Sequence, residues 1–332
     1  MTDPTDQFGL VRDVAVLPGG EVAVLDALAP TIRLYDSYGR HLRDIGRFGD
    51  GPGEFRNPTD LAAKVDTLVV LDEAGRLTWF DKGGQALRTE RAVIEPLCGG
   101  DHNAGYGGVL PDGSLMVRCQ ERLFGRVRGE YRQEVGLLRK RSPPQVDTIG
   151  WFPADTGRTD ARGVAVPRPY TPGTTLLWAA SPTRVFVAAS DQSVIRSFRF
   201  DGSDARTFAT DARARRATDE DVAAEMEEML RFVVEDNDRR VVSEWGGGRP
   251  RATNTPAIRS LVVASTGDIW VETWDAPTEG SRWIIHGADG QAKGVALAPQ
   301  GTGILAVGED RAVVLWRDEF DTDRIRLYRL SH

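Results

Sequence analysis

The sequence predicts an all-β fold, a six-bladed β-propeller of four-stranded antiparallel blades, with one helical insertion between blades 4 and 5. Three observations lead to this prediction. A unit of turn, apolar run, second turn and second run recurs along the chain. The runs are rich in Val, Leu, Ile and aromatic residues, which suit strands buried on both faces. The turns contain glycines, which allow the positive backbone angles of tight hairpins.

Six such units follow one another, and we expect each to form one blade. The second strands end near residues 26, 72, 119, 189, 273 and 316, so that most intervals match a blade of ordinary length and two contain insertions. We place the whole propeller in a single domain, residues 1–332. The predicted blades cover residues 11–46, 59–92, 106–150, 174–210, 257–298 and 303–330, and the helical insertion covers 211–256.

Glycine-containing turns mark where the second strand begins in several blades. Pro18-Gly19-Gly20, Pro111-Asp112-Gly113 and Thr266-Gly267-Asp268 precede the second strands of blades 1, 3 and 5. The stretch Ile45–Pro58, IGRFGDGPGEFRNP, joins blade 1 to blade 2. It contains no GxxxxGK[ST] fingerprint, so we interpret it as a structural link and not as a phosphate-binding loop.

Blade 6 lacks residues for a fourth strand, because its third strand ends near Leu330. The N-terminus must supply that strand, yet only Met1–Leu10 precede blade 1, and Pro4 weakens this stretch as a strand. We therefore expect a short or absent outer strand. The shortage also suggests that upstream residues are missing.

Insertions fall on the links that open at one face of a propeller, and such loops usually form a binding surface. They span residues 90–105, 150–174, 210–256, 274–281 and 317–323. The longest contains a predicted helix that Thr218 and Asp221 can cap. Its apolar residues recur at helical spacing and predict either a lid on the propeller or a helix that docks a partner; they are Val222, Met226, Met229, Leu230 and Val233.

Composition limits the partners. The net charge of −7 argues against a general attraction to nucleic acid, and no apolar run reaches the length of a transmembrane segment. Residues 1–7 do not resemble a signal peptide. A basic cluster is interpreted as a solvated strand face; it contains Arg122, Arg126, Arg128, Arg132, Arg139, Lys140 and Arg141. Cys98 and Cys119 can form either a disulfide, which implies an oxidising compartment, or two buried thiols.

Catalytic and metal-binding patterns are weak. His102, beside Asp101 and Asn103 in an inter-blade link, has no companion at a diagnostic spacing among Glu54, Arg56, Tyr170 and Asp191. We therefore favour a network of hydrogen bonds that fixes the loop. Five acidic residues near second-strand ends could hold calcium in the tunnel; these residues are Asp26, Asp72, Asp191, Glu272 and Asp318. Cys119 and Ala189 occupy the strand-end positions of blades 3 and 4 and interrupt the ring. We therefore favour a structural role, in which the carboxylates cap loops by accepting backbone hydrogen bonds. We expect no cofactor, with tunnel calcium as the alternative.

Three stretches carry a family resemblance: VRDVAVLPGGEVAVLD, IRLYDSYGRHLRDIGRFGDGPGEFRNP and RDEFDTDRIRLYRL. They resemble bacterial six-bladed propellers related to NHL repeats. The resemblance implies the fold and suggests an extracytoplasmic, periplasmic location, although this sequence lacks the leader that such proteins often carry. It transfers no catalytic residue, because the family has no agreed set.

The leading functional hypothesis is a non-catalytic binding or scaffold module that presents its loop-rich face to a protein or peptide, as a subunit of a larger assembly. The predicted binding residues are Arg56, His102, Asn103, Trp151, Tyr170, Arg249 and Trp274. The alternative is a metal-dependent hydrolase or lyase in the tunnel, similar to lactonase-type propellers. RNA binding is disfavoured by the acidic balance. The sequence does not set the oligomeric state.

Overall fold

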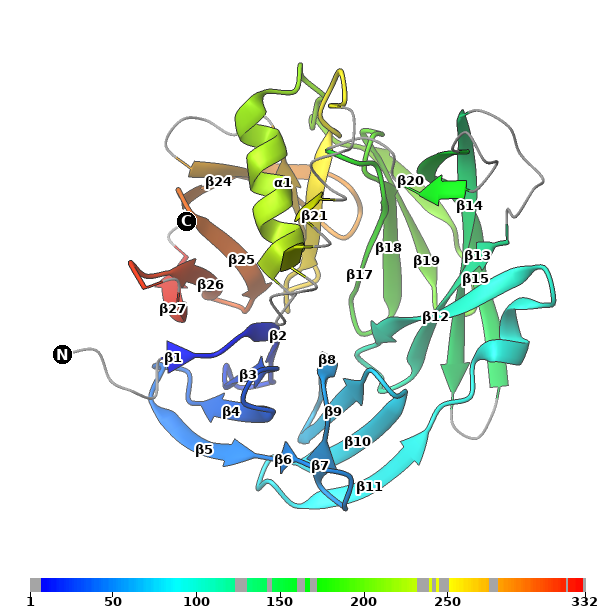
Figure 1. Cartoon of the computed structure of the whole chain (residues 1–332). Helices are drawn as coiled ribbons and strands as arrows, with labels where there is room; N and C mark the ends of the chain where they lie inside the picture. Colours follow the sequence, from blue (N-terminus) through cyan, green and yellow to red (C-terminus); the bar gives the residue numbers. More distant parts are fainter. Residues whose placement is uncertain are drawn as a thin grey trace.

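The computed structural model describes residues 7–122, 130–141, 145–159, 165–167, 172–231, 239–240, 243–244, 251–274, 280–320 and 322–330. Within these residues, six antiparallel sheets surround a central axis (Figure 1). The predicted six-bladed β-propeller is confirmed. We number the strands of each blade from first, nearest the axis, to fourth, at the rim.

Blades 1, 2, 4 and 5 each contain four consecutive strands. Blade 1 comprises β2 (Val11–Val16), β3 (Val22–Asp26), β4 (Thr31–Tyr35) and β5 (His41–Ile45). Blade 2 comprises β8 (Pro58–Lys64), β9 (Thr67–Asp72), β10 (Arg76–Asp81) and β11 (Ala86–Arg91). Blade 4 comprises β17 (Leu176–Ala180), β18 (Arg184–Ala189), β19 (Val194–Arg199) and β20 (Arg206–Ala209). Blade 5 comprises β21 (Ile258–Val263), β22 (Ile269–Thr273), β23 (Gly280–His286) and β24 (Ala292–Pro299).

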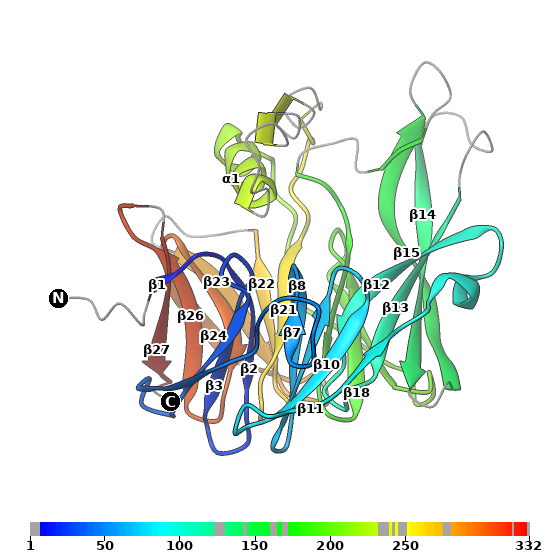
Figure 2. The same ribbon diagram turned by 60° about the horizontal axis from the view of Figure 1, so that its bottom comes forward.

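Blade 3 differs from these four because a fifth strand is added at its rim. It comprises β12 (His102–Val109), β13 (Leu115–Glu121), β14 (Glu130–Arg141), β15 (Gln145–Thr159) and β16 (Ala165–Pro167). The long β14 and β15 extend beyond the neighbouring blades (Figure 2). The first strand begins at His102, so His102 and Asn103 belong to a strand and not to the link in which the sequence placed them.

Blade 6 closes the ring with both ends of the chain. It comprises β25 (Thr302–Val307), β26 (Arg311–Arg317), β27 (Asp323–Arg329) and, at the rim, β1 (Gln7–Phe8) from the N-terminal region. Gln7 pairs with Arg324 and Phe8 with Asp323. The expectation of a short outer strand from the N-terminus is confirmed.

The core lies between blades, because each second strand is apolar on both faces and packs against two neighbours. All five residues of Val22–Asp26 are buried. Six hydrophobic clusters each join two adjacent blades; the cluster between blades 1 and 2, for example, includes Leu25, Phe55 and Phe80. The blades are therefore held mainly by apolar burial around the whole ring.

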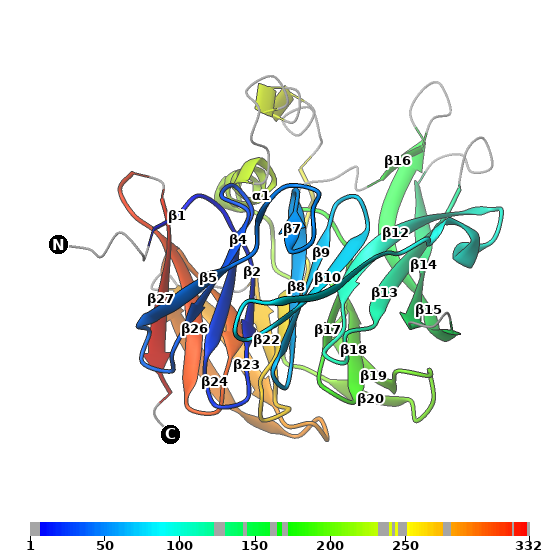
Figure 3. The ribbon, with the colours of Figure 1, turned by 90° about the horizontal axis from the view of Figure 1, so that it is seen from below.

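The two ends of the ring differ. One end, which we call the insertion face, bears the links between second and third strands and between successive blades. The other, the hairpin face, bears the turns between first and second and between third and fourth strands. The helix α1 (Asp219–Arg231) and the ends of β14 and β15 rise on the insertion face, whereas short turns end the strands opposite (Figures 2 and 3).

Shorter elements complete the insertion face. The link from blade 1 to blade 2 forms a small parallel pair, β6 (Arg47–Phe48) and β7 (Glu54–Phe55), and the 3-10 helix η2 (Glu95–Cys98) precedes blade 3. No helix in the described part of the chain combines the length and apolar character needed to cross a membrane.

Candidate binding face

The link around Arg56 is a self-contained loop. The Arg56 guanidinium forms an ion pair with Asp50 at 2.6 Å and lies 4.8 Å from the centre of the Phe48 ring. Glu54 accepts a hydrogen bond from the Gly51 N–H at 2.8 Å, and Phe55 is buried beneath the loop. These contacts agree with the interpretation of Ile45–Pro58 as a structural link. Arg56 is half-exposed and remains accessible at its surface.

The structure brings His102 and Trp151 together, although they lie on the first and fourth strands of blade 3. Their ring centres are 4.8 Å apart. Gly136 makes this possible, because the Trp151 ring lies over it and a Cβ there would approach the ring to 2.9 Å. Trp151 is 40% exposed. Asn103 accepts a hydrogen bond from Arg122 Nε at 2.8 Å. These residues form an aromatic and amide surface, which suits binding more than proton transfer.

Trp274 lies at the foot of the lid, by which we mean α1 and its N-terminal turn. The Arg259 guanidinium stands 5.1 Å from the Trp274 ring centre, and the Trp274 carbonyl accepts a hydrogen bond from Arg215 Nε at 2.9 Å. Arg215 also binds both carboxylate oxygens of Asp221, at 2.6 and 2.7 Å. One arginine therefore joins blade 5 to the start of the lid.

The N-terminus of α1 has the predicted cap. The Thr218 N–H donates to Asp221 Oδ2 at 2.7 Å, and the Asp221 N–H donates to Thr218 Oγ1 at 3.3 Å. Burial raises the pKa of Asp221, but the hydrogen bonds from Arg215 and Thr218 outweigh this and leave it below the usual range. The carboxylate is thus held ionised where the helix dipole favours negative charge.

Polar contacts hold the lid over three blades, while its apolar side is incompletely covered. Glu225 accepts a hydrogen bond from the Gly173 N–H ahead of blade 4, and Glu227 pairs with Arg317 of blade 6 at 3.3 Å. Figure 2 shows α1 above the ends of the strands, on the insertion face. The apolar residues Val222, Met226, Met229 and Leu230 are only half-buried. Val233, Tyr170 and Arg249 lie outside the described residues.

The acidic residues at second-strand ends serve mainly as loop caps. Asp26 accepts hydrogen bonds from four backbone N–H groups, those of Gly9, Leu10, Leu28 and Ala29. Asp72 binds the backbone and side chain of Arg76, and Asp318 binds Arg324 and two backbone N–H groups. Glu272 accepts from Ser260, and Asp191 pairs with Arg132. No group of three His, Cys, Asp or Glu side chains among the described residues is arranged to hold a metal ion.

The arginines of blade 3 also have acidic partners. Arg132 binds both oxygens of Asp191 at 2.7 Å, Arg139 binds Asp112, and Arg141 pairs with Asp147 at 3.2 Å. Arg126 and Arg128 lie outside the described residues. These pairs leave the three arginines neutralised, but Arg139 and Asp147 are only 14% and 13% exposed, so this part of the strand face is largely buried and not solvated.

Cys98 and Cys119 form a disulfide, with Cα atoms 5.4 Å apart. Both residues are buried in the cluster between blades 2 and 3. The bond ties η2 to β13, so it fixes the link that precedes blade 3 to the second strand of that blade.

Two carboxylates that the sequence analysis missed lie on neighbouring first strands. Asp13 accepts a hydrogen bond from the Leu61 N–H of blade 2 at 2.7 Å, and Asp60 accepts one from the Val109 N–H of blade 3 at 2.7 Å. Burial raises the pKa of Asp13 to about 6; burial and the charge of Asp13 raise that of Asp60 well above its usual value. The matching positions of Asp in VRDVAV and PTDLAA are a signal that could have revealed them.

Comparison with known proteins supports the architecture. No family model matches the sequence, and no curated protein matches it. A member of the DUF4221 family from Bacteroides vulgatus matches with a TM-score of 0.56 at 12% identity, over 99% of this chain and 95% of that chain. A protein from Bacteroides fragilis described as exported matches with a TM-score of 0.50 at 13% identity, over 100% and 93%. Likenesses at this identity show the fold alone.

Proposed function

We propose that the protein is a non-catalytic binding or scaffold module, related to NHL-type propellers, that presents its insertion face to a protein or peptide as part of a larger assembly. The observation that carries this proposal is the lid. Its methionines are half-buried on a helix held by ion pairs and hydrogen bonds, and methionine adapts to varied apolar partners. The exposed Trp151 beside His102 extends the surface, since aromatic side chains anchor many interfaces.

The disulfide favours an extracytoplasmic location for this module. Disulfides persist in oxidising compartments and are rare in the cytosol of mesophiles. The exported description of the Bacteroides fragilis neighbour agrees with this proposal but concerns that protein.

The alternative, a metal-dependent hydrolase or lyase in the tunnel, has less support. Each acidic residue near a second-strand end already accepts hydrogen bonds or pairs with an arginine. Asp13 and Asp60 have raised pKa values, but both accept backbone hydrogen bonds that join blades. Elemental analysis of purified protein tests this alternative, which stoichiometric calcium or zinc would favour.

Removal of the lid tests the binding proposal, and the structure shows where to cut. The Ala217 N–H donates to the Thr253 carbonyl at 3.1 Å, so the two ends of the segment already lie side by side. Residues 218–252 are replaced by Gly-Ser-Gly, and partner recovery from a native extract is compared by quantitative mass spectrometry. A second variant, Met226→Glu with Met229→Glu, changes only the apolar side of the helix.

We expect both variants to lose a partner that the unaltered protein and a control retain. The control is Val295→Ser, which changes an exposed apolar residue on β24, at the rim of blade 5. Melting curves establish that each variant is folded. Equal recovery by all four proteins would contradict a binding role for the lid.

A further inference from the structure

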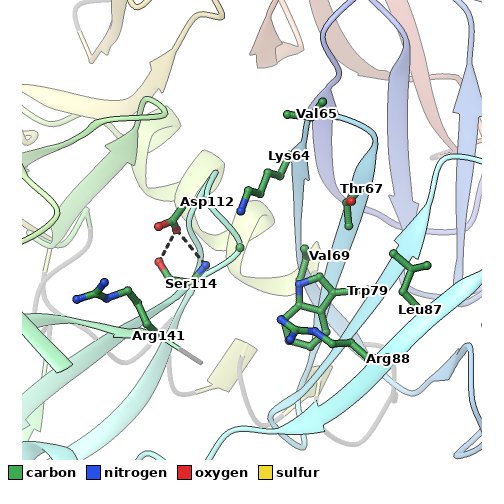
Figure 4. Close-up of a pocket in the computed structure, with 11 residues that line it drawn as sticks. Lys64, Val65, Thr67, Val69, Trp79, Leu87, Arg88, Asp112, Ser114 and Arg141 are labelled. Atoms are coloured by element: carbon green, nitrogen blue, oxygen red, sulfur yellow. Dashed lines mark hydrogen bonds between the residues drawn. The ribbon is translucent and has the colours of Figure 1, made fainter. Parts of the chain in front are cut away.

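The hairpin face carries a hollow of about 570 Å³ between blades 2 and 3, away from the lid. Its walls come from the first turn of each blade, from Trp79 on β10, from Leu87 and Arg88 on β11, and from Arg141 at the end of β14 (Figure 4). A volume of this size is typical of small-molecule sites. The hollow is independent of the proposed function, because it lies at the opposite end of the ring.

Two cations in the hollow have no acidic partner among the described residues. The Lys64 side chain extends from blade 2 toward the Asp112 turn of blade 3 (Figure 4). The Arg88 guanidinium stacks on Trp79, 3.9 Å from the ring centre. Nearby cations are engaged differently: Lys82 pairs with Asp66 at 3.1 Å, and Arg139 and Arg141 pair with acidic residues. Three cationic side chains, Lys64, Arg88 and Arg141, and one carboxylate, Asp112, line the hollow, so it is locally positive.

An apolar wall faces these charges. Trp79 is 7% exposed and forms the floor beneath Arg88, while Leu87 and Val65 are 54% and 66% exposed at the edge. A stacked guanidinium keeps its N–H edges available for a carboxylate or phosphate. An anionic group could thus contact Lys64 and Arg88 while a flat apolar body lies along the wall.

We propose that this hollow binds a small organic anion with a flat apolar body. Lys64 and Arg88 neutralise the anionic group, and the exposed side chains of Leu87 and Val65 contact the body. The negative charge and the flat body together define the ligand class.

Calorimetric titration with 2-naphthoate, 2-naphthyl phosphate and the neutral 2-naphthalenemethanol tests the proposal. Both anions should bind, and the neutral compound should bind at least about tenfold more weakly. Lys64→Gln and Arg88→Gln should each weaken binding of the anions by roughly tenfold, since each removes one charge-assisted contact. Lys293→Gln, which removes a lysine that pairs with Asp268 on blade 5, should leave binding unchanged.

Each result bears on the proposal. Failure of the unaltered protein to bind either anion would overturn it, as would equal affinities for the unaltered protein, the Lys64 variant and the Arg88 variant. A loss in the Lys293 variant as large as in the other two would also overturn it. Melting curves for each variant separate loss of binding from loss of fold.

Discussion

The hairpin face and the insertion face are stabilised in different ways. On the hairpin face, the turns close through backbone hydrogen bonds between residues three apart, such as Gly20 N–H to the Leu17 carbonyl at 3.0 Å and Gly113 N–H to the Leu110 carbonyl at 2.8 Å. On the insertion face, side chains join residues far apart in the chain. Asp26 binds the Gly9 N–H, and Arg215 binds the Trp274 carbonyl.

This difference in stabilisation explains why the hairpin face is regular while the insertion face varies from blade to blade. A turn that depends on its own glycine can be repeated in every blade, because it needs no partner elsewhere. A link that depends on one distant carboxylate or disulfide can have any length, provided that the partner is present. The repeated face therefore keeps the ring regular, while the other face can acquire a lid.

The largest loss of stability is expected from a substitution of a glycine that a hairpin turn requires. Gly202, in blade 4, has φ +79°, and a Cβ there would overlap the carbonyl oxygen of Thr148 in blade 3. We expect Gly202→Ala to reduce the free energy of unfolding by about 4 kcal/mol, from backbone strain and overpacking together. Urea unfolding measures this change.

Gly267 is the matched control for the hairpin substitution. Its φ is +87°, but the nearest atom to an added Cβ is the Ala288 Cβ at 4.0 Å. Gly267→Ala should therefore cost only the backbone strain, about 1 kcal/mol. Equal losses in the two variants would show that the contact between blades at Gly202 contributes nothing.

A slightly smaller effect is expected on the insertion face, from loss of the disulfide. Cys98 and Cys119 are 21 residues apart, and closing a loop of this length stabilises a fold by about 3 kcal/mol. The reduced protein should lose about this amount in urea unfolding. The double variant Cys98→Ala, Cys119→Ala should unfold at the same urea concentration with and without reductant. An unaltered protein that is insensitive to reductant would contradict the prediction.

The difference between local turns and long-range side-chain contacts also explains which features the sequence could predict. Glycine turns and apolar runs are local signals, so the six blades and the short outer strand of blade 6 could be predicted. The cap formed by Thr218 and Asp221 is also local and could be predicted. Pairing across the rim of blade 3 could not, because the position of Trp151 over Gly136 depends on strand register.

The candidate sites were less predictable than the fold for the same reason. His102 is near Trp151 only once β12 to β15 are aligned, and Arg215 meets Trp274 only once blade 5 is in place. The hollow of Lys64 and Arg88 is formed by turns and strands of two neighbouring blades, and no single stretch of sequence identifies it. Each site is a property of neighbouring blades and not of a sequence window.

The smallest effect is expected from Asp13 and Asp60. Their side chains accept hydrogen bonds from the first strand of the neighbouring blade, so side chains also join residues far apart in the chain inside the ring. Burial raises the pKa of Asp13 to about 6, although the positive charge of Arg12 opposes this. A raised pKa means that the folded state holds the proton more tightly than the unfolded state. The resulting stability is present below the unfolded pKa near 3.8 and is lost as pH rises through about 6.

Asp13→Asn removes this dependence, because the amide does not ionise. Relative to the unaltered protein, the variant should gain about 2 kcal/mol of unfolding free energy between pH 4 and pH 7, whatever constant offset its altered hydrogen bonds introduce. Asp36→Asn is the control. The backbone and side chain of Arg40 lower the pKa of Asp36, so its stabilising contribution is lost as pH falls, and its removal should act in the opposite direction at lower pH. A difference between the Asp13 variant and the unaltered protein that stays constant from pH 4 to pH 7 would contradict the prediction, because it would show that the fold does not raise the pKa of Asp13.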